Sequence, residues 1–282
     1  MKPVLKWVGG KTRLMKKIKE VLPDKIRNYH EPFFGGGSVL FSLEDKITGR
    51  IYINDYNKDL INVYKNIRKN PRELISKLKL LKRAYLKSKD KRAFYNKKRK
   101  NLNENKTFNS RRAALYIFIN KTNFNGIMIK DKNDKIVSGW GQHEKPEIFK
   151  VSNIMKVSSF LNTRNVIITN LDYEKSLKKA KKGDFVFMDP PYVPDDITLW
   201  KDRYLKQRWT TNDFERTFDV LEQLTKRGCI VMFANSLSSM IRRRFSKDKR
   251  FKMLKVPIKR TISRNKKARV IKHEVLILNY KA

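Results

Sequence analysis

The clearest chemical signal in the chain is the tetrapeptide Asp189, Pro190, Pro191 and Tyr192. It directly follows the apolar run FVFM, which is typical of a buried strand. An amino group conjugated to a ring is a poor nucleophile because its lone pair is delocalised. The Asp189 carboxylate and the Pro190 carbonyl could hold the two hydrogens of such an amine and favour the tetrahedral nitrogen that attacks a methyl group, while Tyr192 stacks on the ring. An ordinary strand-ending turn is the alternative.

A second set of candidate residues lies where other predicted strands end. Gly35 and Gly37 belong to PFFGGGS, in which the missing side chains let the backbone turn tightly and approach a ligand. Asp55 lies 18 residues beyond Gly37, where an acid can accept hydrogen bonds from both ribose hydroxyls of a nucleoside. Asp172 follows the third predicted strand and could accept from the exocyclic amine of that nucleoside. Each of these aspartates could instead cap the helix that follows it.

The predicted pocket is acidic, although the chain as a whole is short of acids. Asp55, Asp172 and Asp189 all follow strands, at the edge where ligands bind in open α/β sheets. A cationic ligand suits such a pocket, and the sulfonium of S-adenosylmethionine is one. The sequence therefore favours S-adenosylmethionine as the cofactor.

The charge of the chain indicates a polyanionic partner. It has 67 lysines and arginines against 27 aspartates and glutamates, a formal net charge of +40. Residues 65–112 hold 19 basic and 3 acidic residues, and residues 241–272 hold 15 basic and 1 acidic residue. Nucleic acid is the natural partner, because cations that neutralise phosphates release counterions. Many of the lysines could instead simply solvate helix faces.

Other features of the composition restrict the class of protein. Three histidines (His30, His143 and His273) and the single Cys229 are spread along the chain, so we expect no metal site. There is no run of 18 apolar residues and no signal-peptide pattern at the start, so we expect a soluble, cytoplasmic protein that neither enters a membrane nor is secreted. The oligomeric state, monomer or weak dimer, is left open.

Strand-like runs alternate with helical patterns along the chain, as in a doubly wound α/β sheet. The interval from about 70 to 160 breaks this alternation with basic helices and then a hairpin around Asn133 and Asp134. We expect residues 1–68 and 160–282 to form a catalytic, cofactor-binding domain and residues 69–159 to form an insert. The seven predicted strands cover 28–33, 50–55, 165–169, 184–189, 229–234, 251–257 and 272–280.

The motifs, taken in order, resemble those of the Dam family of DNA adenine N6-methyltransferases. The resemblance covers nearly the whole chain. It implies a mostly parallel, seven-stranded, Rossmann-like methyltransferase sheet with a DNA-recognition insert, and methyl transfer to adenine in double-stranded DNA, with the base flipped into the pocket. The matching elements are KWVGGK (6–11), EPFFGGGS (31–38), INDYN (53–57), NFNG (123–126), GDF with DPPY (183–192) and HEVLILNY (273–280).

The resemblance also implies roles for individual residues. Trp7 and Lys11 would lie beside the cofactor and the target base, and Phe34 with Gly35 and Gly37 would line the methionine side of the cofactor. Asp55 would bind the ribose, Asp172 the adenine amine, and Asp189 would lie against both cofactor and target. Phe124 and Asn125 would wedge into the duplex and Lys6 would contact a base.

One position departs from the family pattern. Members that methylate GATC commonly carry an arginine three residues after the glycine of NFNG, to contact a guanine, and this chain has Ile129 there. An aliphatic side chain cannot make the bidentate contact that arginine makes. The turn VSGWG (137–141) also lacks the usual proline. We therefore expect a relaxed or non-GATC target.

A basic segment near the end of the chain, residues 260–273, is predicted to be a loop that contacts phosphates. Its candidate DNA-binding residues are Arg260, Arg264, Lys266 and Lys267. A solvated lysine-rich turn is the alternative.

Several readings of the function stay open at this point. A D-P-P-Y pocket also suits the N4 amine of cytosine, and RNA could replace DNA as the substrate. A catalytically silent, basic DNA-binding protein is an alternative of another class, which the glycine loop and Asp55 disfavour. A protein glutamine methyltransferase would usually carry Asn at position 189. The target sequence, and whether the enzyme acts alone or beside a nuclease in a restriction–modification pair, are left open.

Overall fold

The computed structural model describes residues 1–193, 209–259 and 271–281. The predicted phosphate-contacting residues Arg260, Arg264, Lys266 and Lys267 lie outside the described residues.

A seven-stranded sheet forms the centre of the molecule, with the strand order β3-β2-β1-β4-β5-β7-β6. Neighbouring strands from β3 to β5 run parallel, and β7 runs antiparallel to both β5 and β6. This confirms the predicted mostly parallel, doubly wound α/β fold, and each predicted strand is present. The strands are β1 (Tyr29–Glu31), β2 (Ile51–Asn54), β3 (Val166–Thr169), β4 (Phe185–Met188), β5 (Ile230–Ser236), β6 (Lys252–Lys259) and β7 (Ile271–Leu278).

Helices cover both faces of the sheet, and the central strand β4 shows why. All four of its residues are buried. Because side chains alternate across a strand, Phe185 and Phe187 join the core on one face, while Val186 and Met188 join a second core on the other. The first core packs under α1 (Met15–Glu20), α2 (Leu40–Leu43) and α3 (Lys58–Lys69), and the second under α8 (Tyr173–Ser176), α9 (Thr211–Lys226) and α10 (Ser239–Phe245).

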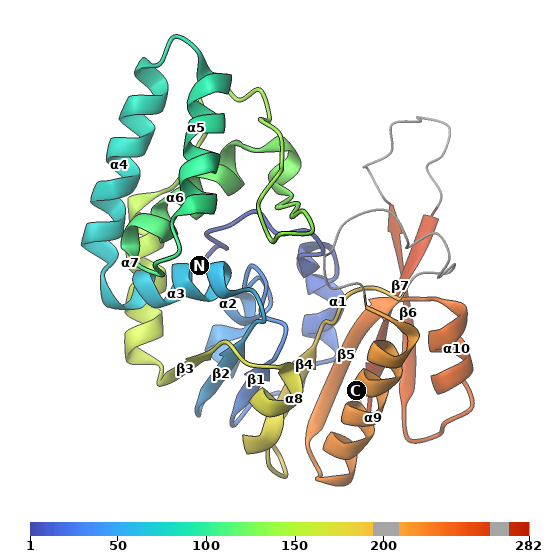
Figure 1. Ribbon diagram of the computed structural model, residues 1–282. Helices are drawn as coiled ribbons and strands as arrows, with labels where there is room; N and C mark the ends of the chain where they lie inside the picture. Colours follow the sequence, from blue (N-terminus) through green and yellow to red (C-terminus); the bar gives the residue numbers. More distant parts are fainter. Residues whose placement is uncertain (194–208, 260–270, 282) are drawn as a thin grey trace.

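A group of helices follows α3 and lies on one side of the molecule, away from α9 and α10 (Figure 1). Its apolar residues belong to the same core as the α3 face of the sheet. The predicted division at 69–159 stays a prediction, and α7 runs across its second boundary. The helices are α4 (Pro71–Lys87), α5 (Lys91–Glu104), α6 (Ser110–Thr122) and α7 (Val151–Thr163).

A hairpin-like loop connects α6 to α7. The Val137 amide donates to the Ile129 carbonyl (2.9 Å) and the Asp131 amide to the Lys135 carbonyl (2.9 Å). Asp134 at the turn has a positive φ of 62°. The chain therefore reverses at the predicted Asn133–Asp134 position. None of the helices in the described residues is long and apolar enough to cross a membrane.

Candidate active site

The glycine loop after β1 and the acid after β2 are joined by hydrogen bonds. The Gly35 amide donates to Asp55 Oδ2 (2.9 Å) and the Asn57 amide donates to Asp55 Oδ1 (2.9 Å). Partial burial raises the pKa of Asp55 to about 6, with the two amide donors opposing the shift. Asp55 is thus fixed at the carboxyl end of β2, the position at which a nucleoside ligand would meet it.

The glycines of this loop are required by close packing. Gly35 has φ of +51°, and a Cβ there would lie 2.7 Å from the indole of Trp7. Gly37 has φ of +74°, and a Cβ there would lie 2.5 Å from the Phe34 ring. The Phe34 ring is itself buried against Phe41 and Tyr64. Phe34 can therefore line a ligand through its main chain, while its ring belongs to the core.

The tetrapeptide after β4 lies against the N-terminal segment. Lys11 is 2% exposed, and its Nζ donates to Asp189 Oδ2 (2.5 Å) and to the Gly9 carbonyl (2.8 Å). The same Nζ lies 4.9 Å from the centroid of the Tyr192 ring, a cation–π distance. Burial raises the pKa of Asp189, and the Lys11 charge partly offsets this. The structure thus brings Lys11, Asp189 and Tyr192 together from segments that are remote in the sequence.

Asn235, near the end of β5, fixes the chain directly after the two prolines. It is fully buried. Its Oδ1 accepts from the Val193 amide (2.9 Å) and its Nδ2 donates to the Pro191 carbonyl (3.3 Å). Among the described residues none donates to the Pro190 carbonyl, the acceptor that the sequence assigns to a target amine. Asn235 is not among the residues predicted from the sequence, although a polar residue directly after the apolar run IVMFA was a usable signal.

Asp172 has the helix-capping geometry that was its alternative interpretation. It is the N-cap of α8, and its Oδ1 accepts from the Glu174 amide (3.0 Å). The same oxygen accepts from Arg216 (2.9 Å), which also pairs with the Glu174 carboxylate (2.6 Å). The Asp172 side chain is still 31% exposed, so a ligand can reach it. A ligand bound there would share the carboxylate with Arg216.

Asparagines tie together the loops around this edge of the sheet. Asn54, the last residue of β2, donates to the carbonyls of Pro32 (3.1 Å) and Leu171 (3.0 Å). Asn170 donates to the carbonyls of Asp55 (2.7 Å) and Tyr56 (3.0 Å). These bonds connect the loops after β1, β2 and β3 into one rim.

Apolar side chains remain exposed on the same rim. Tyr56 is 62% exposed and Leu171 is 43% exposed, and each is next in sequence to one of the two aspartates, Asp55 or Asp172. Large exposed apolar residues beside a partly buried acid suit a flat nucleobase above a ribose. Neither residue is among those predicted from the sequence, because a single apolar residue in a loop carries no local pattern.

The predicted DNA wedge lies on a tight turn after α6. Phe124 is 63% exposed, and Asn125 is exposed with a positive φ of 56°. Gly126 is packed so closely on Lys6 that a Cβ at this glycine would lie 2.5 Å from the Lys6 Cβ. The structure thus places Phe124 and Asn125 in solvent beside Lys6, the three residues predicted to contact DNA bases.

Three side chains of α5 hold the hairpin-like loop behind this turn. Tyr95 and Arg99 both donate to the Ser138 carbonyl (2.7 Å each), and Asn103 donates to the Ile136 carbonyl (3.0 Å). They are spaced four residues apart and therefore share one face of the helix. Ile129 is half-buried in this loop, and its amide donates to Ser138 Oγ (2.7 Å).

No group of three or more His, Cys, Asp or Glu side chains that could hold a metal occurs among the described residues. His30 lies at the other end of the sheet. Burial lowers its pKa, so it is neutral at pH 7 and donates from Nε2 to Asp184 Oδ2 (3.2 Å).

Comparison with known proteins gives a consistent family across the whole chain. The model of the family described as D12 class N6 adenine-specific DNA methyltransferase matches residues 7–262. A relative named Type II methyltransferase M.MjaIII, from Methanocaldococcus jannaschii, is 34% identical over 99% of this chain and 99% of its own length. Type II methyltransferase M1.LlaDCHI of Lactococcus lactis subsp. cremoris is 31% identical over 99% of this chain and 96% of its own. The DNA adenine methylase of Escherichia coli K12 is 26% identical over 97% and 94%.

Proposed function

The chain belongs to the D12 class of N6 adenine-specific DNA methyltransferases, and from this membership we propose that it transfers the methyl group of S-adenosylmethionine to the N6 amine of an adenine flipped out of double-stranded DNA. The observation that carries the proposal is Asp189 at the carboxyl end of β4, a half-buried carboxylate paired with Lys11, whose Nζ also lies over the Tyr192 ring.

The rim of the sheet fits S-adenosylmethionine. A Cβ at Gly35 or Gly37 would clash with Trp7 or Phe34, so these glycines let the loop after β1 turn tightly beside Asp55, where its backbone would line the cofactor. Asp55 would accept from the ribose hydroxyls, with Tyr56 and Leu171 as apolar surfaces for the adenine. Asp172 would accept from the adenine amine, sharing its carboxylate with Arg216. When bound, the cofactor supplies an electrophilic methyl group on a sulfonium.

The residues after β4 would orient the acceptor amine. Lys11 donates to Asp189 Oδ2, so we assign the N6 hydrogen bond to Asp189 Oδ1 and a second one to the Pro190 carbonyl. The nitrogen would form its bond to the methyl carbon that the cofactor supplies, the electron pair of the broken carbon–sulfur bond would stay with sulfur, and the amine would give up one proton. Asp189, whose pKa is raised by burial, would take that proton and pass it to solvent.

The remaining groups around the pocket would hold Asp189 and the base in place. Lys11, which donates to Asp189, favours the ionised carboxylate that must accept hydrogen bonds. Tyr192 would stack on the flipped adenine and offset part of the cost of unstacking, roughly a few kcal/mol. Asn235 would keep Pro191 and Val193, and with them the Pro190 carbonyl, in a fixed direction.

DNA would approach over the turn after α6. Phe124 and Asn125 would enter the duplex, and Lys6 would contact a base beside the target. The net charge of +40 favours backbone-dominated binding.

The predicted contacts from Arg260, Arg264, Lys266 and Lys267 remain part of the proposal. Neutralising these four cations should weaken DNA binding for all sequences and reduce the salt slope by about 0.9 for each phosphate that the protein no longer neutralises. An unchanged slope would remove the segment from the interface.

We further propose a target other than GATC, or a relaxed one. Ile129 lies in the hairpin-like loop beside the turn 124–126, and its side chain has no donor for a guanine.

The family supports adenine over cytosine N4 as the acceptor. Two relatives aligned over nearly their full length are named Type II methyltransferases, which favours a modification role beside a restriction nuclease.

The decisive experiment is methyl transfer from labelled S-adenosylmethionine to unmethylated DNA by wild type and by Asp189→Ala. Nucleoside analysis of the digest and single-molecule mapping of the sites would follow. N6-methyladenine that disappears in the variant is expected. N4-methylcytosine, or tight DNA binding with no transfer, would reject the proposed reaction, and methylation confined to GATC would reject the specificity.

A further inference from the structure

Helix α6 carries three buried polar residues on one face. Arg112, Tyr116 and Asn120 are spaced four residues apart, so they are stacked along the helix. They are buried, with exposed fractions of 9%, 0% and 0% respectively. Buried polar groups need partners, and each of these three has at least one partner in the sheet-forming part of the chain, either in residues 57–59 or at Lys6.

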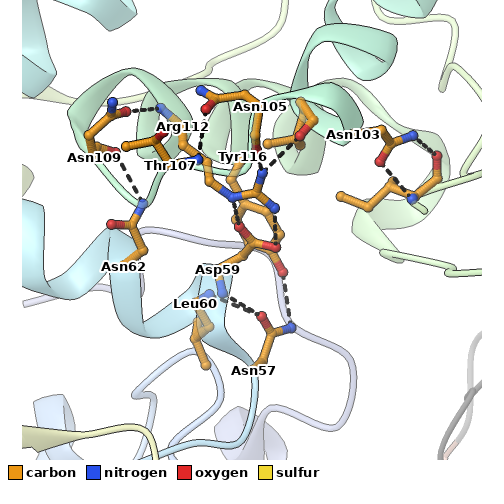
Figure 2. A network of polar contacts seen from close by, with 12 residues as sticks. Asn57, Asp59, Leu60, Asn62, Asn103, Asn105, Thr107, Asn109, Arg112 and Tyr116 are labelled. Atoms are coloured by element: carbon orange, nitrogen blue, oxygen red, sulfur yellow. Dashed lines mark hydrogen bonds and ion pairs between the residues drawn. The ribbon is translucent and has the colours of Figure 1, made fainter. Parts of the chain in front are cut away.

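The first two residues fix α6 against the start of α3. Figure 2 shows the Arg112 guanidinium facing the Asp59 carboxylate, with Nε–Oδ1 and Nη2–Oδ2 distances of 2.5 and 3.0 Å. Arg112 also donates to the Leu102 carbonyl (2.9 Å) and to the Asn105 carbonyl. Asn57 Nδ2 donates to the Tyr116 hydroxyl (3.3 Å). Because a bidentate Arg–Asp pair sets orientation as well as distance, α6 has a defined position relative to the Asp55 loop.

The third residue, Asn120, joins two segments that we expect to touch DNA. Its Oδ1 accepts from the Lys6 amide (2.8 Å), and its Nδ2 donates to the Lys6 carbonyl (2.9 Å) and to the Gly126 carbonyl (3.1 Å). The amide group thus pairs with both backbone groups of Lys6, much as a neighbouring strand would. Each hydrogen of Nδ2 is used, one on each segment.

The segment that begins at Lys6 leads directly to Asp189. Lys6 lies against Gly126, Trp7 packs on Gly35, and Lys11 bonds to Asp189. Residues 6–11 therefore connect the turn after α6 to Asp189. Asn120 ties the Lys6 end of this segment to that turn.

We propose that Asn120 is a positioning residue that holds Lys6 and the turn 124–126 in one fixed arrangement, so that DNA bound at Phe124 and Asn125 is aligned with Asp189. This role rests on the DNA reaction proposed above. It assigns no contact between Asn120 and DNA, cofactor or the reacting atoms. The predicted consequence is a defect in the use of DNA that leaves cofactor binding intact.

The test compares wild type with Asn120→Asp and with a matched control. Asn120→Asp keeps the acceptor for the Lys6 amide but sets an oxygen against the two carbonyls that Nδ2 now satisfies. The control is Asn162→Ala on α7, because Asn162 Nδ2 also bridges two carbonyls, those of Ser158 (2.8 Å) and Arg68 (3.0 Å). It lies near the end of α3, away from the turn after α6.

Three quantities are measured for each protein: the Kd for S-adenosylmethionine without DNA, the kcat/KM for DNA, and amide hydrogen exchange in peptides covering residues 5–12 and 123–129. For Asn120→Asp we expect kcat/KM for DNA to fall about 10- to 100-fold, as for a misplaced reactant. The Kd for the cofactor should stay within about twofold. Exchange should become faster in the two named peptides, and Asn162→Ala should match wild type in all three.

The outcomes separate this inference from the proposed reaction. Cofactor affinity and DNA use that fall together would show a general structural role and overturn the inference, as would unchanged exchange in both peptides. If wild type transfers no methyl group, the proposed function fails. In that case the exchange data and the Kd for a mixed-sequence duplex still decide the role of Asn120, and unaltered values for Asn120→Asp would reject it.

Discussion

Strand β4 has an aspartate at each end, and the two carboxylates have opposite environments. Asp184, before the strand, accepts hydrogen bonds from Asn28 (2.9 Å), Arg27 (3.1 Å), His30 (3.2 Å) and the Lys181 amide (3.0 Å). Burial alone would raise the pKa of Asp184, but these donors outweigh it and lower the pKa. Asp189, after the strand, accepts from Lys11 within the described part of the chain, and burial raises its pKa.

The difference separates an acid that holds the fold from one that is available for chemistry. A carboxylate surrounded by donors is stabilised as an anion and has little capacity for a further ligand. A carboxylate with one strong donor and a raised pKa can still accept a hydrogen bond and a proton, as functional groups do. The same contrast extends along the sheet. At the Asp189 end, burial also raises the pKa of Asp55 and of Glu31. The other end has a hollow of about 420 Å³ whose lining includes Asp184 and four cations, among them Arg50 and Lys181.

The largest expected effect comes from exchanging the acid after β4 for its amide. Asp189→Asn should slow the single-turnover methyl-transfer rate about 10³-fold, because the amide cannot take the proton from N6. Rapid-quench measurement of the first turnover would check this. A rate within tenfold of wild type would show that the two ends of β4 do not differ in function.

The second effect concerns the cofactor. Asp55→Asn should weaken binding of S-adenosylmethionine about 10- to 150-fold, because hydrogen bonds to a charged acceptor contribute about 1.5–3 kcal/mol. Isothermal titration calorimetry would measure the Kd. An unchanged Kd would remove Asp55 from the cofactor site.

The third effect is on stability and not on activity, in contrast to the effect expected for Asp189→Asn. Asp184→Asn should lower the free energy of unfolding by about 2 kcal/mol, because it leaves buried donors without an acceptor, while methyl transfer changes less than about twofold. Denaturant unfolding and steady-state rates would test both halves. Glu20→Gln is the control, since its exposed pair with Lys17 (3.0 Å) should contribute less than about 1 kcal/mol. Loss of activity without loss of stability would contradict the structural assignment of Asp184.

The smallest effect is a difference in pH dependence. The folded pKa of Asp55, about 6, is above that of an unfolded aspartate, so the folded protein binds this proton more tightly. Stability from this group is therefore present at low pH and lost as pH rises through 6, by about 1–2 kcal/mol after allowance for its partial exposure. Asp184 has the opposite sign: its lowered pKa gives stability above pH about 4, which is lost in acid.

Unfolding of Asp55→Asn and Asp184→Asn at several pH values, without cofactor, would resolve the two signs. Relative to wild type, Asp55→Asn should be less sensitive to pH between about 4 and 6. Asp184→Asn should be less sensitive below about 4. The difference in unfolding free energy between wild type and variant should change with pH in opposite directions for Asp55→Asn and Asp184→Asn. A change in the same direction for both variants would contradict the comparison.

The amino-acid sequence by itself determined the strands, the class of sheet and the residues that end its strands. Runs such as FVFM report burial on both faces, and DPPY is a local combination with few other uses, whereas a glycine triplet alone could be an ordinary loop turn. Because parallel strands end at one edge, the sequence could also predict that Asp55, Asp172 and Asp189 lie on that edge. It could not decide which partner each of them has: Asp172 proved to cap α8 and pair with Arg216, and Asp189 to pair with Lys11.

Tertiary structure alone decided which polar residues hold the site. Asn120 is 114 residues from Lys6, Asn235 is 44 residues from Pro191, and Lys11 is 178 residues from Asp189. Periodicity reports whether one face of an element is buried, but a buried asparagine looks the same in sequence whatever it bonds to. Its partner is set by how the helices and strands pack, because a hydrogen bond needs atoms about 3 Å apart, and only the folded chain brings them to that distance.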